Sequence, residues 1–344
     1  MISAQHLGCD TSIQEFRGRV LAWFDANARD LPWRETHDPY CIWISEIMLQ
    51  QTRVAAVIAH YHEFLRRFPT VTKLAAARES SVLAAWSGLG YYRRARMMHA
   101  AAKQIVRKRK GKFPETAARW RELPGIGRYT AAAIASIAFD ESVAVVDGNV
   151  ERVLQRTRGK HLSVQDCWQA AEELLDGSRP GDFNQAMMEL GATICVPRSP
   201  MCLTCPVVDL CATRGELPAI ASPPRQIKRQ IDYVLACRNS AVFLVRRSKD
   251  ASLMAGMWEL PELKGANGVG NLRQRDSKPA ISVRHSITIT NYEVRVWQGR
   301  PSGRPGEWVP LTRLPKLALT GLARKILRRA NLLPAPQSAP ASMG

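Results

Sequence analysis

The chain has 344 residues, of which 46% are apolar and 23% charged, so a disordered or collagen-like chain is excluded and two or three domains are expected. No apolar run approaches the roughly 20 residues that cross a bilayer, and no export signal is visible, so we expect a cytoplasmic, nucleoid-associated protein with no membrane partner. The net charge of +19 favours a polyanionic partner, above all nucleic acid.

Residues 12–215 have the pattern of many short helices, with apolar residues every three or four positions and prolines at the boundaries. Within PYCIWISEIMLQ, Glu46 interrupts a largely apolar run. Burial among such neighbours would raise the pKa of this carboxyl, so that it could hold a proton near neutral pH as a general acid does. A solvent-facing Glu46, or one paired with an arginine, is the alternative.

The segment LPGIGRYTAAAI predicts a helical hairpin at residues 123–130. Pro124 ends one helix, Gly125 and Gly127 permit a tight turn, and an Ala-rich helix begins near Tyr129. The free N–H groups at the start of that helix could bind a phosphate without sequence preference. A plain turn between two helices explains the same pattern.

The next segment, SVAVVDGNVERVLQR, places Asp147 between an apolar stretch and a new helix with period 3.6. An aspartate at this position is typical of a helix N-cap. The segment by itself therefore predicts a cap and leaves a catalytic role open.

Four of the eight cysteines are crowded together, with the spacing C-x6-C-x2-C-x5-C. They are Cys195, Cys202, Cys205 and Cys211. Four soft ligands in so short a segment favour an iron–sulfur cubane over zinc, because zinc sites more often use two C-x2-C pairs. Unrelated buried thiols are a third possibility.

The pattern changes after the cysteines. Residues 216–230 mix proline, small and basic residues and predict a linker, and residues 231–333 contain β-like segments and a closing helix near 319–330, so we expect an α+β module. Residues 334–344 are expected to be a loose tail. Residues 222–344 hold 21 Lys and Arg against 7 Asp and Glu, so 14 of the 19 net charges lie here. This module is either a clamp on nucleic acid or a solvated basic surface.

Together and in this order, several segments resemble the helix–hairpin–helix DNA glycosylases that carry an iron–sulfur loop, in particular their adenine-excising members. The segments are LPWR, WISEIMLQQT, WSGLGYYRRA, LPGIGRYTAAAI, VVDGNVERVL, FNQAMMELGA and the four-cysteine loop. The resemblance implies a mainly α glycosylase region, formed by a helical barrel and an iron–sulfur helical domain, followed by an α+β Nudix-like domain. It also implies a [4Fe–4S] cluster on the four cysteines and a monomer that binds double-stranded DNA with adenine opposite 8-oxoguanine or guanine.

Individual roles follow from the same resemblance. Glu46 would protonate the departing adenine, and Asp147 would stabilise or trap the sugar cation. Tyr129 occupies the position where related strand-cleaving enzymes carry a Schiff-base lysine, which implies a monofunctional hydrolase. The other implied site residues are Asn149 and Glu189 in the pocket and Gln51, Thr52, Leu89, Tyr91, Gly125 and Gly127 against DNA.

One departure from the family pattern concerns the base opposite adenine. Ile287, Thr288 and Ile289 stand where the family has Phe-Ser-His, so only the Thr288 hydroxyl is available to contact the lesion. Two other functions remain open at this point: the same fold acting on another mispair or on oxidised pyrimidines with lyase activity, and a DNA-binding iron–sulfur sensor without catalysis.

Overall fold

A computed structural model of the chain describes residues 10–218, 227–248, 250, 251, 254–263, 278–287, 290–300 and 305–334. The chain forms two compact units. The first comprises Met1–Tyr61, Thr70–Thr72 and Ala100–Ala221, and the second comprises His62–Pro69, Lys73–His99 and Ser222–Gly344. Three helices have residues in both units: α3 (Val54–Arg67), α4 (Val71–Ala76) and α6 (Arg93–Arg109).

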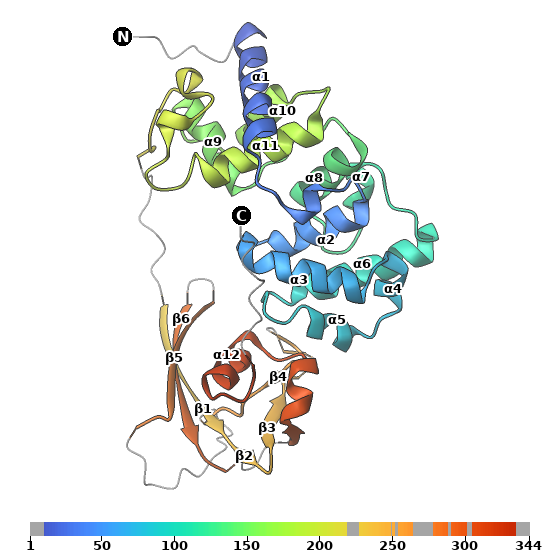
Figure 1. Cartoon of the computed structure of the whole chain (residues 1–344), viewed down its shortest axis with the longest axis vertical. Coiled ribbons are helices and arrows are strands. Elements are labelled where there is room, and N and C mark those ends of the chain that lie inside the picture. The colour runs from blue at the N-terminus through green and yellow to red at the C-terminus, as the bar shows by residue number, and fades with distance from the viewer. Residues whose placement is uncertain are drawn as a thin grey trace. The chain divides into compact units, whose positions relative to one another are not determined.

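The described part of the first unit is helical (Figure 1). Its further elements are α1 (Asp10–Asn27), η1 (Pro32–Arg34), α2 (Pro39–Leu49), α7 (Ala117–Trp120), α8 (Arg128–Phe139), α9 (Gly148–Arg158), α10 (Val164–Leu174), α11 (Pro180–Thr193), η2 (Cys202–Thr204) and η3 (Val208–Leu210). Local sequence signals set several ends. Ser163 and Asp166 form a reciprocal capping box at α10, and Gly159, with φ of 67°, ends α9. The predicted helical character is confirmed.

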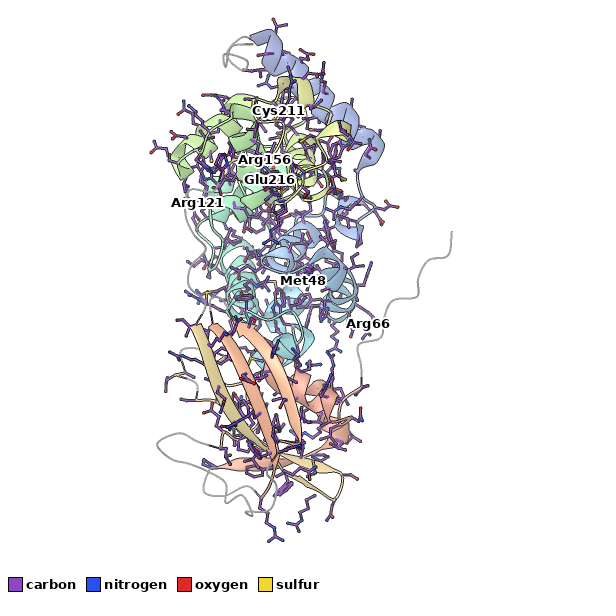
Figure 2. The ribbon with its side chains drawn as sticks, turned by 90° about the vertical axis from the view of Figure 1, so that its left-hand side faces the viewer. Met48, Arg66, Arg121, Arg156, Cys211 and Glu216 are labelled. Carbon is purple, nitrogen blue, oxygen red and sulfur yellow. The ribbon has the colours of Figure 1, made fainter. Side chains whose placement is uncertain are left out.

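Two apolar clusters hold the first unit together. Helices α1, α9, α10 and α11 pack around one core that also includes Val207 of the cysteine-bearing segment. Around α2 and α7, the rings of Trp43, Phe113 and Trp120 pack against one another. Met48 of α2, which is labelled in Figure 2, is fully buried. The cysteine segment and the start of α9 therefore rest on a common, close-packed support.

The second unit contains helix α5 (Glu79–Ala85) and two small sheets. In one sheet, β6 (Thr290–Gln298) lies between β1 (Ile227–Leu235), which is parallel to it, and β5 (Ile281–Ile287), which is antiparallel. In the other, β3 (Ala241–Arg246) pairs antiparallel with β2 (Cys237–Arg238), β4 (Trp258–Glu259) and β7 (Gly306–Pro310). The turn η4 (Leu311–Lys316) and helix α12 (Gly321–Arg329) follow.

Helix α12 packs against the apolar core that residues of the two sheets form, which we call the sheet region (Figure 1). Thr320 caps it by accepting from the Ala323 N–H, and Ile326 and Leu327 are fully buried in a cluster with residues of both sheets. The predicted α+β module with a closing helix is confirmed. Residues 219–226 of the predicted linker and 335–344 of the predicted tail lie outside the described residues, and the predicted domain boundaries stay a prediction. Among the described helices, none combines the length and apolarity that a membrane span requires.

Candidate active site

Glu46 is a buried acid on α2. The helix begins where the Asp38 side chain accepts from the Tyr40 N–H and Pro39 fills the first position. Most of the helix is apolar and buried, and Glu46 is only 5% exposed. The Tyr129 hydroxyl, from the first turn of α8, donates to Glu46 Oε2 at 2.8 Å.

The pKa of Glu46 is raised to about 7. Burial is the main cause. The hydrogen bond from Tyr129 lowers the pKa, the charge of Asp147 raises it and the charge of Arg34 lowers it. A carboxyl with this pKa is protonated in a large fraction of molecules at neutral pH and can act as a general acid.

Asp147 is the N-cap of α9. Its Oδ1 accepts from the backbone N–H groups of Asn149 and Val150, both at 2.8 Å, and its Oδ2 accepts from the Asn149 side-chain amide at 2.9 Å. The cap predicted from the sequence is present, and the same hydrogen bonds fix the direction of the carboxylate. Capping and an electrostatic role are therefore compatible.

One cavity of about 590 Å³ brings these groups together. It is lined by Glu46, Tyr129, Asp147, Asn149, Glu189, Gln51 and Thr52 among the predicted site residues, and also by Arg29, Arg34, Gln185 and Met188. Its volume falls within the range of about 300–1,000 Å³ that is typical of small-molecule sites. The cavity thus offers one space with three carboxyl groups in its walls, those of Glu46, Asp147 and Glu189.

Glu189 of α11 holds two arginines at the cavity wall. Its carboxylate accepts from Arg29 Nε at 2.6 Å, from Arg29 Nη2 at 2.7 Å and from Arg34 Nη2 at 2.9 Å. Burial raises the pKa of Glu189, but the two guanidinium groups outweigh it and lower the pKa to about 2. Glu189 therefore stays ionised, in contrast with Glu46.

The remaining predicted residues lie elsewhere. Gly125, with φ of 78°, and Gly127, the N-cap of α8, form the turn between α7 and α8. Leu89 and Tyr91 belong to the second unit, where Leu89 is 5% and Tyr91 45% exposed. Thr288 lies outside the described residues.

Helix α11 meets the first turn of α9 at Gly191. A Cβ at this position would lie 2.6 Å from Asn149 Cβ and 2.8 Å from the Asn149 carbonyl oxygen. Gly191→Ala should therefore displace Asn149, lower the free energy of unfolding by about 1–3 kcal/mol and slow the reaction of the site. Thermal unfolding and single-turnover kinetics check this. Gly18→Ala is the matched control, since a Cβ there meets nothing within 4 Å and stability should stay the same or rise. Equal behaviour of the two variants would contradict the prediction.

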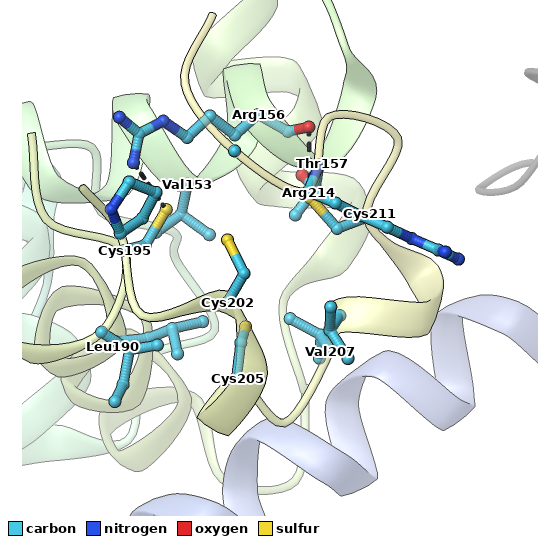
Figure 3. Close-up of a pocket in the computed structure, with 14 residues that line it drawn as sticks. Val153, Arg156, Thr157, Leu190, Cys195, Cys202, Cys205, Val207, Cys211 and Arg214 are labelled. Carbon is cyan, nitrogen blue, oxygen red and sulfur yellow. Dashed lines mark hydrogen bonds between the residues drawn. The ribbon is translucent and has the colours of Figure 1, made fainter. Parts of the chain in front are cut away.

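The four cysteines surround one hollow (Figure 3). Arg156 donates to Cys195 Sγ at 3.4 Å, and the Arg214 backbone N–H donates to Cys211 Sγ at 3.4 Å. A cation and an N–H group beside the sulfur atoms suit thiolate ligands. The donor set therefore fits an iron–sulfur cluster.

Arg152 links the cysteine segment to the cavity. Its Nε donates to the Cys195 carbonyl at 2.6 Å, and its Nη2 donates to Asn149 Oδ1 at 2.9 Å and to the Gly191 carbonyl at 2.7 Å. Since Asn149 in turn donates to Asp147, helix α9 joins the cysteine segment to the carboxylate through hydrogen bonds.

Comparisons with known proteins define the class. The family model described as "HhH-GPD superfamily base excision DNA repair protein" matches residues 44–175. The solved structure of a thermostable thymine-DNA glycosylase is similar, with 31% identity and a TM-score of 0.56, over 59% of this chain and 96% of that chain. The predicted helix–hairpin–helix glycosylase fold is confirmed.

Similar proteins with curated names identify the family within this class of DNA glycosylases. Human adenine DNA glycosylase is 46% identical over 229 residues, which cover 62% of this chain and 42% of the relative. Adenine DNA glycosylase of Buchnera aphidicola subsp. Acyrthosiphon pisum is 35% identical over 260 residues, which cover 72% of this chain and 74% of the relative. The chain belongs to the adenine DNA glycosylase family. It spans less than half the length of the human relative.

Proposed function

We propose that this chain is a monofunctional DNA glycosylase of base excision repair, which hydrolyses the N-glycosidic bond of adenine mispaired with 8-oxoguanine or guanine. The observation that carries the proposal is the single cavity shared by Glu46, an acid with a pKa of about 7, and Asp147, a carboxylate held by three donors. The names of the relatives support the choice of adenine.

The reaction begins when the adenine leaves the duplex and enters the cavity, which costs a few kcal/mol of stacking and pairing. Glu46 donates its proton to N7 of the base and makes it a better leaving group. Asp147 stabilises the positive charge that develops on the sugar, or traps C1′ covalently until water attacks. Tyr129 carries no amine, so no Schiff base forms at its position and the strand stays intact.

Contacts with DNA complete the proposal. The N–H groups at the start of α8, next to Gly127, hold a backbone phosphate. Gln51 and Thr52, which line the cavity, lie near the lesion. Leu89 and Tyr91 wedge into the base stack opposite or beside the lesion, and the Tyr91 ring, which is 45% exposed, replaces stacking that flipping removes. The basic residues of the sheet region contact phosphates, and Thr288 contributes to reading the opposite base. The protein acts as a monomer.

A panel of duplexes tests the proposal. Adenine opposite 8-oxoguanine or guanine should release free adenine in single-turnover reactions, and adenine opposite cytosine or an oxidised pyrimidine should not. Borohydride trapping on abasic DNA should yield no strong covalent adduct. Release of oxidised pyrimidines with a trapped adduct would favour the lyase alternative, and tight binding without any base release would favour a sensor.

We further propose that Cys195, Cys202, Cys205 and Cys211 hold a [4Fe–4S] cluster, which fixes the segment that Arg152 and Arg156 contact. Purified protein should be brown and contain about four iron atoms per chain, measured by elemental analysis. Cys202→Ser should lose iron, and Cys237→Ser, at an exposed cysteine of β2, should keep it. A colourless protein with one zinc, prepared without oxygen, would contradict the cluster.

A further inference from the structure

The Tyr129 hydroxyl lies between two acceptors. It is 2.8 Å from Glu46 Oε2 and 3.3 Å from Met188 Sδ. Glu46 belongs to α2 and Met188 to α11, so the two acceptors approach the phenol from different helices. A phenol has a single proton to donate, and a thioether sulfur is a weak acceptor.

The preferred direction of that proton depends on the charge of Glu46. An ionised carboxylate is the stronger acceptor, so the Tyr129 hydroxyl then donates its hydrogen bond to Glu46. When Glu46 is protonated, its own O–H can donate to the Tyr129 oxygen, and the phenol then needs another acceptor. A buried hydroxyl without an acceptor is costly, and Met188 Sδ lies within reach.

We propose that Met188 is a positioning residue whose sulfur accepts a hydrogen bond from the Tyr129 hydroxyl while Glu46 is protonated. After Glu46 has protonated the base, the hydroxyl donates to the Glu46 carboxylate instead. The phenolic proton stays on Tyr129 throughout, and only its direction changes. The Tyr129 hydroxyl thus has an acceptor in both charge states of Glu46. That adenine is the base which Glu46 protonates rests on the proposed function. The change in direction of the Tyr129 hydrogen bond depends only on the charge of Glu46 and occurs without DNA.

Other groups near Glu46 also influence its pKa. The titratable and charged groups around it are Tyr129 of α8, Asp147 at the start of α9, Arg34 of η1, and Glu189 of α11 with its partner Arg29. Met188 is uncharged, so replacing it leaves these charges in place. The proposed route from its sulfur to Glu46 passes through the Tyr129 hydroxyl.

Met188→Leu removes the sulfur with little change in side-chain volume. Carbon-13 NMR of protein labelled at the glutamate carboxyl follows the titration of Glu46 without DNA, and the signal is assigned by its loss in Glu46→Gln. The protonated state loses a hydrogen bond in Met188→Leu, so the midpoint should fall from about 7 by about half a pKa unit. In single-turnover kinetics, the alkaline loss of adenine release should shift to lower pH by the same amount.

The Tyr129→Phe background separates this role from packing. Without the hydroxyl, Met188→Leu has no route to Glu46, so Tyr129→Phe and the double variant should titrate at the same midpoint. An unchanged midpoint in Met188→Leu, or an equal shift in both backgrounds, would overturn the proposal. A wild-type protein that releases no adenine would count against the proposed function alone, because the NMR titration does not require activity.

Discussion

Replacing Glu46 with glutamine is expected to slow adenine release by a factor of about 10² or more. Glutamine keeps the length and shape of the side chain but has no acidic proton for N7. Single-turnover assays on a duplex with adenine opposite 8-oxoguanine measure the rate. The wild-type rate should fall as pH rises through about 7, since the protonated acid is the active form. The variant should lack this limb of the pH profile.

The matched control removes the same charge outside the cavity. Glu115 is exposed, so Glu115→Gln should retain the wild-type rate and pH profile. DNA binding of both variants, measured at one salt concentration, shows whether the substrate still docks. A Glu46→Gln rate within about threefold of wild type would remove Glu46 from the mechanism.

Asp147→Asn is expected to slow adenine release by a factor of about 10²–10³ while changing stability little. Asparagine is as good an N-cap as aspartate, so the bonds from the Asn149 and Val150 N–H groups can persist. The hydrogen bond from the Asn149 side-chain amide to Oδ2 is lost, because asparagine presents an NH2 group at that position. The substitution removes the negative charge that is proposed to stabilise the sugar cation. The combination of a large rate effect with a small change in melting temperature distinguishes catalysis from capping.

The same substitution at another cap provides the comparison. Asp38 caps α2 by accepting from the Tyr40 N–H and does not line the cavity, so Asp38→Asn should keep both stability and rate. A comparable loss of rate in Asp38→Asn and Asp147→Asn would show that general disturbance of a helix start, and not the charge of Asp147, controls the reaction.

Local sequence signals were sufficient for the helices and for part of the site. Glu46 could be singled out because the residues beside it are apolar, and the structure shows it buried. Asp147 could be assigned as a cap because a periodic helix follows it directly. In both cases the informative neighbours are close in sequence, which is where periodicity and capping rules apply.

Contacts between distant segments could not be derived in this way. Arg29 and Glu189 are 160 residues apart, and no local pattern connects them, because their meeting depends on how α1 and α11 pack. The same holds for the parallel pairing of β1 with β6, which any strand-like pattern would allow. Periodicity likewise does not distinguish the buried Leu89 from the exposed Tyr91 in one short turn.

The start of α8 has a consequence for how the substrate is aligned. Gly127 caps the helix whose first N–H groups are proposed to hold a phosphate, and Tyr129, two residues later, donates a hydrogen bond to Glu46. The proposed phosphate contact and the hydrogen-bond partner of Glu46 therefore lie in the same helical turn, the first turn of α8. Because both places belong to one turn, the distance between the bound phosphate and Glu46 is fixed. A duplex that shifts by a single nucleotide would therefore present the wrong base to Glu46.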